Sequence, residues 1–292
     1  MNLQCGDLGI RNPARFLRQV LLYSLTQSVT VKGAAGEPLP SPFRGLAKHE
    51  VDFRRGEFSL IAAGPGTGKS LFAANLAMYG NLPCLYFSAD SNAATQLSRA
   101  TAIITGDDVR VIKRKLVQGD FEDYTPALGK RWWVRFNYEA RPSQRDIETD
   151  LACYFEVFGC FPHLIVVDNV TNVDAGVVGD AESFTFSLEG LCEYLSEMAR
   201  ETHAHVLGLH HVVGEYSDGL KPIPLSGVKG KIGRVPSLIL TIFKEIDGMD
   251  GRVLHISPVK NREGFEDSSG ETFSSYDFDR ASMRLSDALA EF

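Results

Sequence analysis

Short apolar runs recur along the chain, and most are followed by apolar residues at helical spacing. Buried strands are predicted at residues 58–63, 83–89, 132–136, 163–167 and 205–209, and helices at 92–104, 108–117, 142–155 and 184–200. Strands that alternate with helices form a parallel sheet covered on both faces. Residues 237–243, 253–259 and 272–278 alternate like antiparallel strands at one edge. The predicted fold class is therefore α/β, with a mainly parallel central sheet flanked by helices.

The first forty residues differ from the rest of the chain. Asn12 and Pro13 precede apolar residues at helical spacing, which predicts a capped amphipathic helix that ends near Gln27. Residues 33–42 are rich in Gly and Pro, as is typical of a linker. We therefore divide the chain into an N-terminal helical arm with a linker, residues 1–40, and one α/β domain, residues 41–292. The sequence leaves open whether the arm packs on its own domain or elsewhere.

The run FSLIAAGPGTGKS at residues 58–70 carries the clearest chemical signal. A strand, a glycine-rich turn and a helix are the context that a phosphate-binding loop requires. Glycines let backbone N–H groups approach an anion, and the helix N-terminus adds partial positive charge. The usual pattern has Gly five residues before Gly68, where this chain has Ala63. The expected nucleotide contacts come from Gly64, Pro65, Gly66, Thr67, Gly68, Lys69 and Ser70.

The loop that carries Lys69 follows a predicted strand. Three further polar residues lie just past the ends of other predicted strands: Asp90, Asp168 and His211. In a parallel sheet the ligand binds at the carboxyl ends of the strands, so these side chains are expected to lie together. Asp168 closes the run LIVVD, where a carboxylate can hold the water shell of Mg²⁺ opposite the Ser70 hydroxyl. The alternative for Asp168 is an ordinary helix or turn cap.

Asp90 and His211 each have a chemical and a structural interpretation. Asp90 is a candidate general base for an attacking water, and capping the next helix is an equal alternative. A neutral His211 imidazole can hydrogen-bond a γ-phosphate and report its presence to the following loop. The alternative for His211 is a strand-end histidine with no part in chemistry.

Two groups of cations complete the candidate chemistry. Lys260 and Arg262 suit a phosphate reached from outside the subunit, as an arginine finger does, or simply mark a charged hairpin tip. Residues 219–234 contain four cations and no acid, and their glycines let the backbone approach phosphates. The candidate DNA-binding residues are Lys221, Lys229, Lys231 and Arg234. A second acid-free stretch, residues 109–118, we interpret as a solvated helix face.

Composition and charge narrow the class of protein. The chain has 292 residues, enough for one large α/β domain with small appendages. Its net charge of −7 argues against a uniformly basic surface, but a local basic groove is still allowed because phosphate contacts act within about 8–10 Å. No apolar run is long enough for a membrane span and no signal-peptide pattern begins the chain. Five widely spaced cysteines favour free thiols in a reducing cytoplasm.

Together these motifs resemble the RecA-like P-loop NTPase domain of the DnaB-type bacterial replicative helicases. Residues 55–70 match, including an Ala at the start of the phosphate loop. The run FSAD at 87–90 is similar to the family's F-S-L-E, LHH at 209–211 to its L-S-Q, and KNR at 260–262 to its K-x-R finger. The run PLSG at 224–227 resembles the segment beside its DNA-binding loops. The match covers residues 40 to 280, with five motifs in the family's order.

The resemblance implies ATP and Mg²⁺ as ligands and a homo-oligomeric ring, hexameric in the family, that translocates on single-stranded DNA in replication. It also implies a primase or a helicase loader as a partner and no membrane. Lys260 and Arg262 would then act on a neighbour's nucleotide. The expected setting is the cytoplasm of a bacterium or of a phage-infected host.

Three departures from the family pattern keep other functions open. Asp90 replaces the family's glutamate base and is one methylene shorter, His211 replaces its glutamine, and the separate N-terminal helical domain is missing. The nearest picture is a minimal single-domain helicase of the kind that phages and plasmids encode. One alternative is a RecA/KaiC-like ATPase that coats DNA or remodels a partner without unwinding. The other is a nucleotide-gated binding protein with little turnover.

Overall fold

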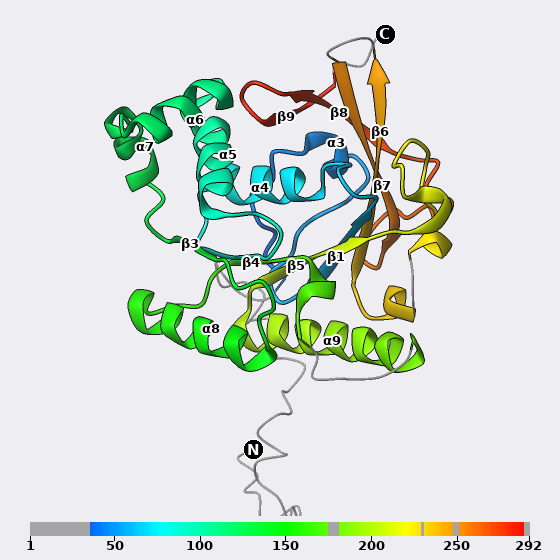
Figure 1. Ribbon diagram of the computed structural model, residues 1–292. Helices are drawn as coiled ribbons and strands as arrows, with labels where there is room; N and C mark the ends of the chain where they lie inside the picture. The colour runs from blue at the N-terminus through cyan, green and yellow to red at the C-terminus, as the bar shows by residue number, and fades with distance from the viewer. Residues whose placement is uncertain (1–35, 175–180, 229–230, 248–250, 289–292) are drawn as a thin grey trace, which may run out of the picture.

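The computed structural model describes residues 36–174, 181–228, 231–247 and 251–288 (Figure 1). The helix expected in the N-terminal arm lies outside these residues, and so does Lys229. Within the described part, nine strands form one sheet in the order β3-β2-β4-β5-β1-β6-β7-β8-β9. They are β1 (Phe58–Ala63), β2 (Cys84–Ser88), β3 (Val134–Asn137), β4 (Leu164–Asp168), β5 (His205–His211), β6 (Leu238–Asp247), β7 (Gly251–Asn261), β8 (Ser274–Asp279) and β9 (Arg284–Asp287).

Helices cover both faces of this sheet (Figure 1). The described helices are α3 (Arg44–Ala47), α4 (Lys69–Tyr79), α5 (Ala93–Thr105), α6 (Val109–Gln118), α7 (Thr125–Gly129), α8 (Gln144–Phe158) and α9 (Ala181–Thr202). Buried residues of α3, α4 and α5 pack on one face, and those of α8 and α9 pack on the other. Alternate residues of β1 supply the two cores, Ile61 facing α4 and Leu60 facing α9. None of the described helices is both long and apolar enough to cross a bilayer.

The sheet has two halves with different strand directions. Neighbours from β3 to β6 are all parallel, whereas β6, β7, β8 and β9 pair antiparallel. The predicted α/β fold with antiparallel strands at one edge is therefore confirmed. In the parallel half, Ala63 of β1 pairs with His211 of β5, and Ser88 of β2 pairs with Asp168 of β4. This register brings the carboxyl ends of four strands to the same edge.

Several element boundaries differ from those that the sequence predicts. Helix α8 begins after Ser143, which forms a reciprocal capping box with Asp146, rather than at Pro142. Strand β5 continues to His211, two residues beyond the predicted end. Helices α3 and α7 and strand β9 were not expected, because a helix of four or five residues is too short to show a period and β9, RLSD, has a single apolar residue.

The described end of the predicted linker is held against the domain by backbone hydrogen bonds. The Gly36 N–H donates to the Arg55 carbonyl at 2.7 Å, and the Leu39 N–H donates to the Phe53 carbonyl at 2.8 Å. The Leu39 side chain is buried in the core beneath α4. Residues 36–39 therefore pack with the α/β domain.

Candidate nucleotide-binding site

The phosphate loop joins β1 directly to α4. Gly68, the last residue before the helix, has a φ of 123°, which a residue with a side chain adopts only with strain. Lys69 is the first residue of α4, so the N–H groups of the first helical turn have no carbonyl partner within the helix. The loop therefore directs backbone donors and the positive end of a helix into the same space, as an anion site requires.

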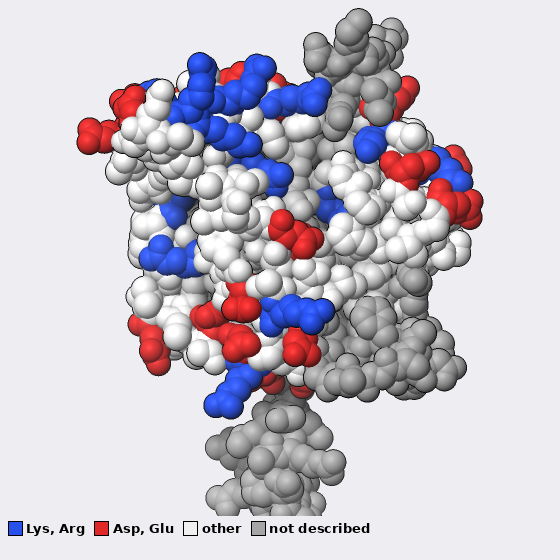
Figure 2. All heavy atoms as spheres, viewed as in Figure 1, with Lys and Arg blue, Asp and Glu red and all other residues white. Residues whose placement is uncertain are grey.

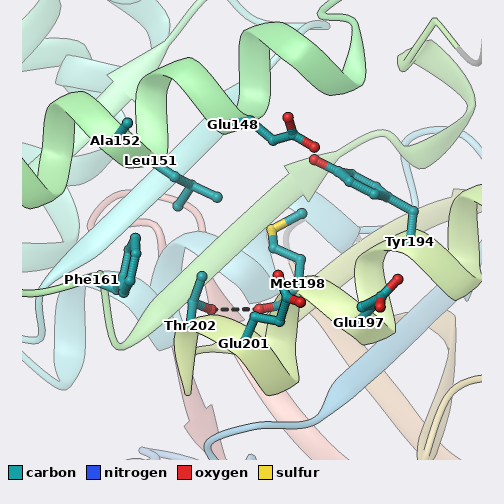
Figure 3. A pocket seen from close by; sticks show the side chains of 9 residues that line it. All are labelled: Glu148, Leu151, Ala152, Phe161, Tyr194, Glu197, Met198, Glu201 and Thr202. Carbon is teal, nitrogen blue, oxygen red and sulfur yellow. Dashed lines mark hydrogen bonds between the residues drawn. The ribbon is translucent and has the colours of Figure 1, made fainter. Parts of the chain in front are cut away.

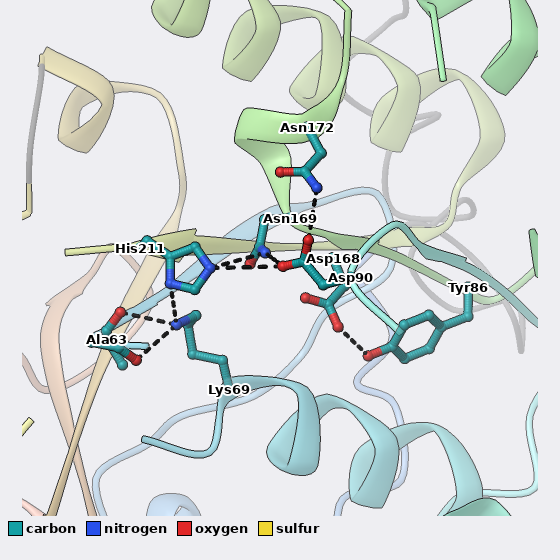
Figure 4. A network of polar contacts seen from close by, with 9 residues as sticks. Ala63, Lys69, Tyr86, Asp90, Asp168, Asn169, Asn172 and His211 are labelled. Carbon is teal, nitrogen blue, oxygen red and sulfur yellow. Dashed lines mark hydrogen bonds and ion pairs between the residues drawn. The ribbon is translucent and has the colours of Figure 1, made fainter. Parts of the chain in front are cut away.

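Lys69 is buried, and its ammonium has three polar neighbours (Figure 4). It donates to the carbonyl oxygens of Ala63 at 2.9 Å and Gly64 at 3.0 Å, and lies 3.0 Å from Nδ1 of His211. Burial lowers the pKa of Lys69 to about 8, and Asp168 and Asp90 oppose this shift. An anion that enters the loop would stabilise the charged ammonium, so the site favours a negatively charged ligand.

Asp168 is the last residue of β4, and only one of its two carboxylate oxygens accepts a hydrogen bond from the described residues. The Tyr86 hydroxyl donates to Oδ2 at 3.0 Å, whereas the buried Oδ1 accepts no hydrogen bond from the described residues. Burial raises the pKa of Asp168, and the hydroxyls of Ser70 and Tyr86 oppose this shift. Cation binding by Oδ1, directly or through a water, would satisfy that oxygen. Asp168 and Ser70 therefore fit the Mg²⁺ that this class of loop uses.

Asp90 is held at the mouth of the site by two amides (Figure 4). Asn169 donates to Oδ2 and Asn172 donates to Oδ1, the latter at 2.9 Å. The Asp90 side chain retains 47% of its exposure, so a water can reach it. The competing cap role belongs to Asn92, whose side chain accepts from the Thr95 N–H at the start of α5. Asp90 is therefore left facing the site.

His211 lies between the lysine and this carboxylate. The Lys69 ammonium lies 3.0 Å from Nδ1 of His211, and the Asn169 amide nitrogen, which also donates to Asp90, lies 3.1 Å from Nε2. Nε2 lies 3.8 Å from Oδ2 of Asp90. Burial and the Lys69 charge lower the pKa of His211, which keeps the ring neutral at pH 7. The structure thus brings together the four side chains that the strand-end argument grouped, with His211 as the link between Lys69 and Asp90.

Lys69, Asp90 and His211 line a cavity of about 290 Å³, together with residues that the sequence argument missed. Arg99 of α5 and Phe278 of β8 line it, and Met283 does so from the β8–β9 turn. Asn169 and Asn172 were detectable as polar residues just past a strand end. Arg99 carried no signal, because a cation within a helix is usually a solvated surface residue.

A larger cavity, about 440 Å³, lies between α8 and α9 and has the opposite character (Figure 3). Leu151, Phe161 and Met198 supply apolar surface there. Its charged lining residues among those described are glutamates: Glu148, Glu197 and Glu201. Three carboxylates repel a triphosphate, so the nucleotide belongs at the strand ends despite the smaller volume.

Lys260 and Arg262 lie at and just beyond the end of β7, and both contact the chain before β6. The Lys260 ammonium donates to three carbonyl oxygens in residues 233–236, and Arg262 donates one bond to the Arg234 carbonyl at 2.8 Å. Arg262 is exposed, and its planar guanidinium has further donors for an outside ligand. Neither residue lines the cavity that holds Lys69.

The candidate DNA-binding residues differ in their surroundings. Lys221 pairs with Glu215 at 2.9 Å and lies over the Tyr216 ring, so the expectation that these cations meet no acid is wrong for Lys221. The acid lies just before the acid-free stretch. Arg234 is exposed, and the side chains of Lys229 and Lys231 lie outside the described residues.

The second acid-free stretch, residues 109–118, forms α6, over which Lys and Arg side chains gather (Figure 2). Lys113 and Arg114 are exposed there, and Lys115 pairs with Asp123 at 2.6 Å. The helix packs through Ile112, as a surface helix with one apolar face does. The interpretation of these cations as an exposed helix face agrees with this position.

The segment that follows β5 begins against the phosphate loop. A Cβ on Gly64 would lie 2.3 Å from the Ser217 carbonyl oxygen, and one on Gly219 would lie 2.3 Å from the Thr67 hydroxyl. Such close approaches are possible only because both positions are glycine. The phosphate loop and the start of the candidate DNA-binding segment are therefore in direct contact.

Comparison with known proteins agrees with this geometry. A family model described as AAA domain matches residues 31–214. The chain belongs to the AAA domain family. The gene 65 protein of Mycobacterium phage L5 is 45% identical to this chain over 266 residues, which cover 91% of this chain and 99% of that protein.

Two solved structures share the fold of this AAA domain protein at 17% sequence identity and a TM-score of 0.72. One is described as the structure of a DnaB-like replicative helicase and its interactions with primase; the match covers 92% of this chain and 66% of that longer one. The other is the ATPase domain of G40P, with coverage of 96% and 99%. The predicted resemblance to a RecA-like helicase ATPase domain is confirmed as a likeness of fold, and the fold is a nucleotide-binding one.

Proposed function

We propose that this protein hydrolyses ATP with Mg²⁺ and uses the energy to move along single-stranded DNA and unwind duplex DNA during phage replication. The observation that supports it most is the linked set of Lys69, His211, Asp90 and Asp168 around one phosphate loop. A charged ligand, a metal and a hydrolytic water each have a matching group there. The fold shared with helicase ATPase domains supports the DNA-directed part.

In the proposed reaction the backbone N–H groups of residues 64–70 and the Lys69 ammonium bind the phosphates. When bound, Mg²⁺ neutralises charge on the phosphoryl oxygens, and Ser70 and Asp168 are the residues placed to hold it. Asp90 orients the attacking water and accepts its proton. The amides of Asn169 and Asn172 fix the carboxylate direction, which limits the disorder that a short side chain would otherwise bring.

His211 is placed to sense the γ-phosphate. Its Nδ1 lies 3.0 Å from the Lys69 ammonium and its Nε2 lies beside Asn169 and Asp90, so movement of Lys69 toward a phosphate would change the contacts of His211. His211 ends β5, and two residues of the chain that follows, Ser217 and Gly219, lie against the phosphate loop. The candidate DNA-binding segment thus starts where the nucleotide would be detected.

Arg262 is proposed to act on the nucleotide of a neighbouring subunit in a ring. The residue is exposed, lies outside the cavity that contains Lys69 and retains donors beyond its one carbonyl bond. A guanidinium supplied from outside stabilises charge on the transferring phosphoryl group. Single-stranded DNA, a homo-oligomeric ring and a primase or helicase loader remain the proposed partners.

Two assays separate this function from the alternatives. Turnover measured with and without oligo-dT should rise with DNA, and a forked duplex should be separated only when ATP is hydrolysed. DNA-stimulated turnover without strand separation would favour the RecA/KaiC-like ATPase that coats or remodels. ATP binding with negligible turnover in both conditions would favour the nucleotide-gated binding protein, for which the short Asp90 base is the supporting observation.

A further inference from the structure

Lys260 has an unusual set of partners for a candidate finger residue. Its ammonium donates to the carbonyl oxygens of Gly233 at 2.7 Å, Arg234 at 3.1 Å and Pro236 at 2.7 Å. An ammonium has three N–H donors, so all of them are engaged within its own subunit. Arg262, two residues later, donates one of its five N–H groups to the same Arg234 carbonyl. The two cations are therefore not equivalent.

Two of the carbonyls that Lys260 binds, those of Gly233 and Arg234, end the 3₁₀ turn Lys231–Arg234, and the third, that of Pro236, lies in the short connection from this turn to β6. The connection is anchored at its far end, because the Ser237 N–H donates to the Phe58 carbonyl and the Arg262 N–H donates to the Ser237 carbonyl. The cation within residues 233–236 is Arg234, whose side chain is exposed. Three carbonyl contacts from one lysine fix the backbone on both sides of that arginine.

Burial agrees with a role inside the subunit. The Lys260 side chain is half-buried, and burial together with the charge of Arg262 lowers its pKa to about 8. Contact with a neighbour's γ-phosphate would require Lys260 to leave its three carbonyls. Arg262 can bind an outside ligand and keep its single carbonyl bond, because that bond uses one of the five N–H donors of the guanidinium.

We propose that Lys260 is a positioning residue that acts in its own subunit, holding the backbone of residues 233–236 so that Arg234 contacts the phosphates of single-stranded DNA. The inference rests on the proposed function, since it takes DNA as the ligand of this segment. It separates the two cations of the KNR run: Arg262 serves the neighbour's nucleotide and Lys260 serves the DNA contact. The DNA-binding segment is then fixed near the phosphate loop at its start and by Lys260 at its end.

A double-mutant cycle tests whether Lys260 acts through Arg234. The full chain, with a non-hydrolysable ATP analogue, is titrated into fluorescent oligo-dT as parent, Lys260→Met, Arg234→Ala and the double variant. Lys260→Met and Arg234→Ala should each weaken binding about tenfold, or about 1.4 kcal/mol. The double variant should bind no more weakly than Arg234→Ala, because the second change removes nothing further. The KM for ATP should be unchanged in Lys260→Met.

Lys113→Met on α6 is the matched control and should leave DNA affinity unchanged, since it removes an exposed lysine from another surface. Lys260→Arg, which keeps donors at the same position, should recover part of the affinity. Thermal melting shows whether Lys260→Met is folded. If it is not, the double-mutant cycle is measured with Lys260→Arg in its place, again combined with Arg234→Ala.

Three results would overturn the inference. Additive losses in the double variant would mean that Lys260 does not act through Arg234. Unchanged DNA affinity in Lys260→Met with turnover reduced about 10³-fold would assign Lys260 to the neighbour's phosphate. Parental affinity in Arg234→Ala would remove the DNA contact itself. A parent protein that hydrolyses ATP but does not bind oligo-dT would instead refute the DNA part of the proposed function, and this inference with it.

Discussion

The two halves of the sheet are built differently and carry different chemistry. The parallel half gathers Lys69, Asp90, Asp168 and His211 at the carboxyl ends of neighbouring strands. Lys69, Asp90 and His211 line one cavity, in which His211 lies 3.0 Å from Lys69 and 3.8 Å from Asp90. The antiparallel half places Lys260 and Arg262 at the end of β7, outside that cavity and against the backbone before β6. The parallel strands place their site residues around one cavity within the subunit, whereas the antiparallel strands place Lys260 and Arg262 outside that cavity, with Arg262 exposed.

This difference suggests that a single subunit holds an incomplete site. The parallel half has the groups for phosphates, metal and water, but within the described residues Lys69 and Arg99 are the cations that line the cavity. The finger that would stabilise transferring charge is on the other half and is exposed. Oligomerisation is therefore proposed to complete the site, and disrupting each half should have different consequences.

Lys69→Ala should have the largest effect. The variant removes the ammonium at the base of the phosphate loop, so ATP hydrolysis should be abolished while the fold is retained. Steady-state phosphate release, with circular dichroism as the check on folding, measures both. The matched control is Lys113→Ala, which should keep parental turnover. Unchanged turnover in Lys69→Ala would contradict the assignment of the parallel half as a nucleotide site.

Arg262→Ala should reduce turnover about 10³-fold or more, the usual share of an arginine finger. ATP affinity measured on isolated subunits should change little, because Arg262 lies outside the cavity of its own subunit. Titration with a fluorescent ATP analogue separates the two quantities. An equal loss of affinity in dilute, monomeric protein would place Arg262 on its own nucleotide instead.

Asp90→Asn should lower turnover at least about 100-fold and leave ATP binding intact, because an amide cannot accept the proton of the attacking water. Asp90→Glu tests the reach of the base and should hydrolyse ATP faster than Asp90→Asn. Single-turnover kinetics measure the chemical step directly. If both variants match the parent, the base lies elsewhere in the site.

The smallest effect concerns the DNA-binding segment. Removing one cation that binds a DNA phosphate should reduce the salt dependence of single-strand binding by about 0.7 in the slope of log affinity against log salt. Lys231→Ala and Arg234→Ala should each show this reduction for every DNA sequence tested, and Lys113→Ala should not. A weakening that depends on the DNA sequence would contradict recognition through the backbone.

The sequence predicted most of the parallel half because its site residues lie at or shortly after the ends of buried runs. Leu164–Asp168 is an apolar strand with the polar residue at its end, and Phe58–Ala63 is an apolar strand that leads into the phosphate loop; parallel strands bring such ends together. Asn172 was not predicted as a partner of Asp90, since that contact depends on how the chain turns after β4. Arg99 was missed for the same reason: only tertiary packing brings α5 to the cavity.

The antiparallel half was predicted less completely. The alternation of residues 237–278 indicated the strands, but β9 is too short to show a pattern. Lys260 is 24 residues from Pro236, and a pattern along the chain does not reveal that three carbonyls surround one ammonium. The acid that pairs with Lys221 lies just outside the acid-free stretch, so counting charges within that stretch overlooked it.

The most direct test of the central claim mixes two inactive proteins, Lys69→Ala and Arg262→Ala. In a mixed ring, some interfaces combine an intact phosphate loop on one subunit with an intact Arg262 on the next. We predict that ATP turnover partly returns on mixing and that it varies with the ratio of the two proteins. Mixtures that co-assemble, as shown by mass measurement, but recover no activity would contradict a site shared between subunits.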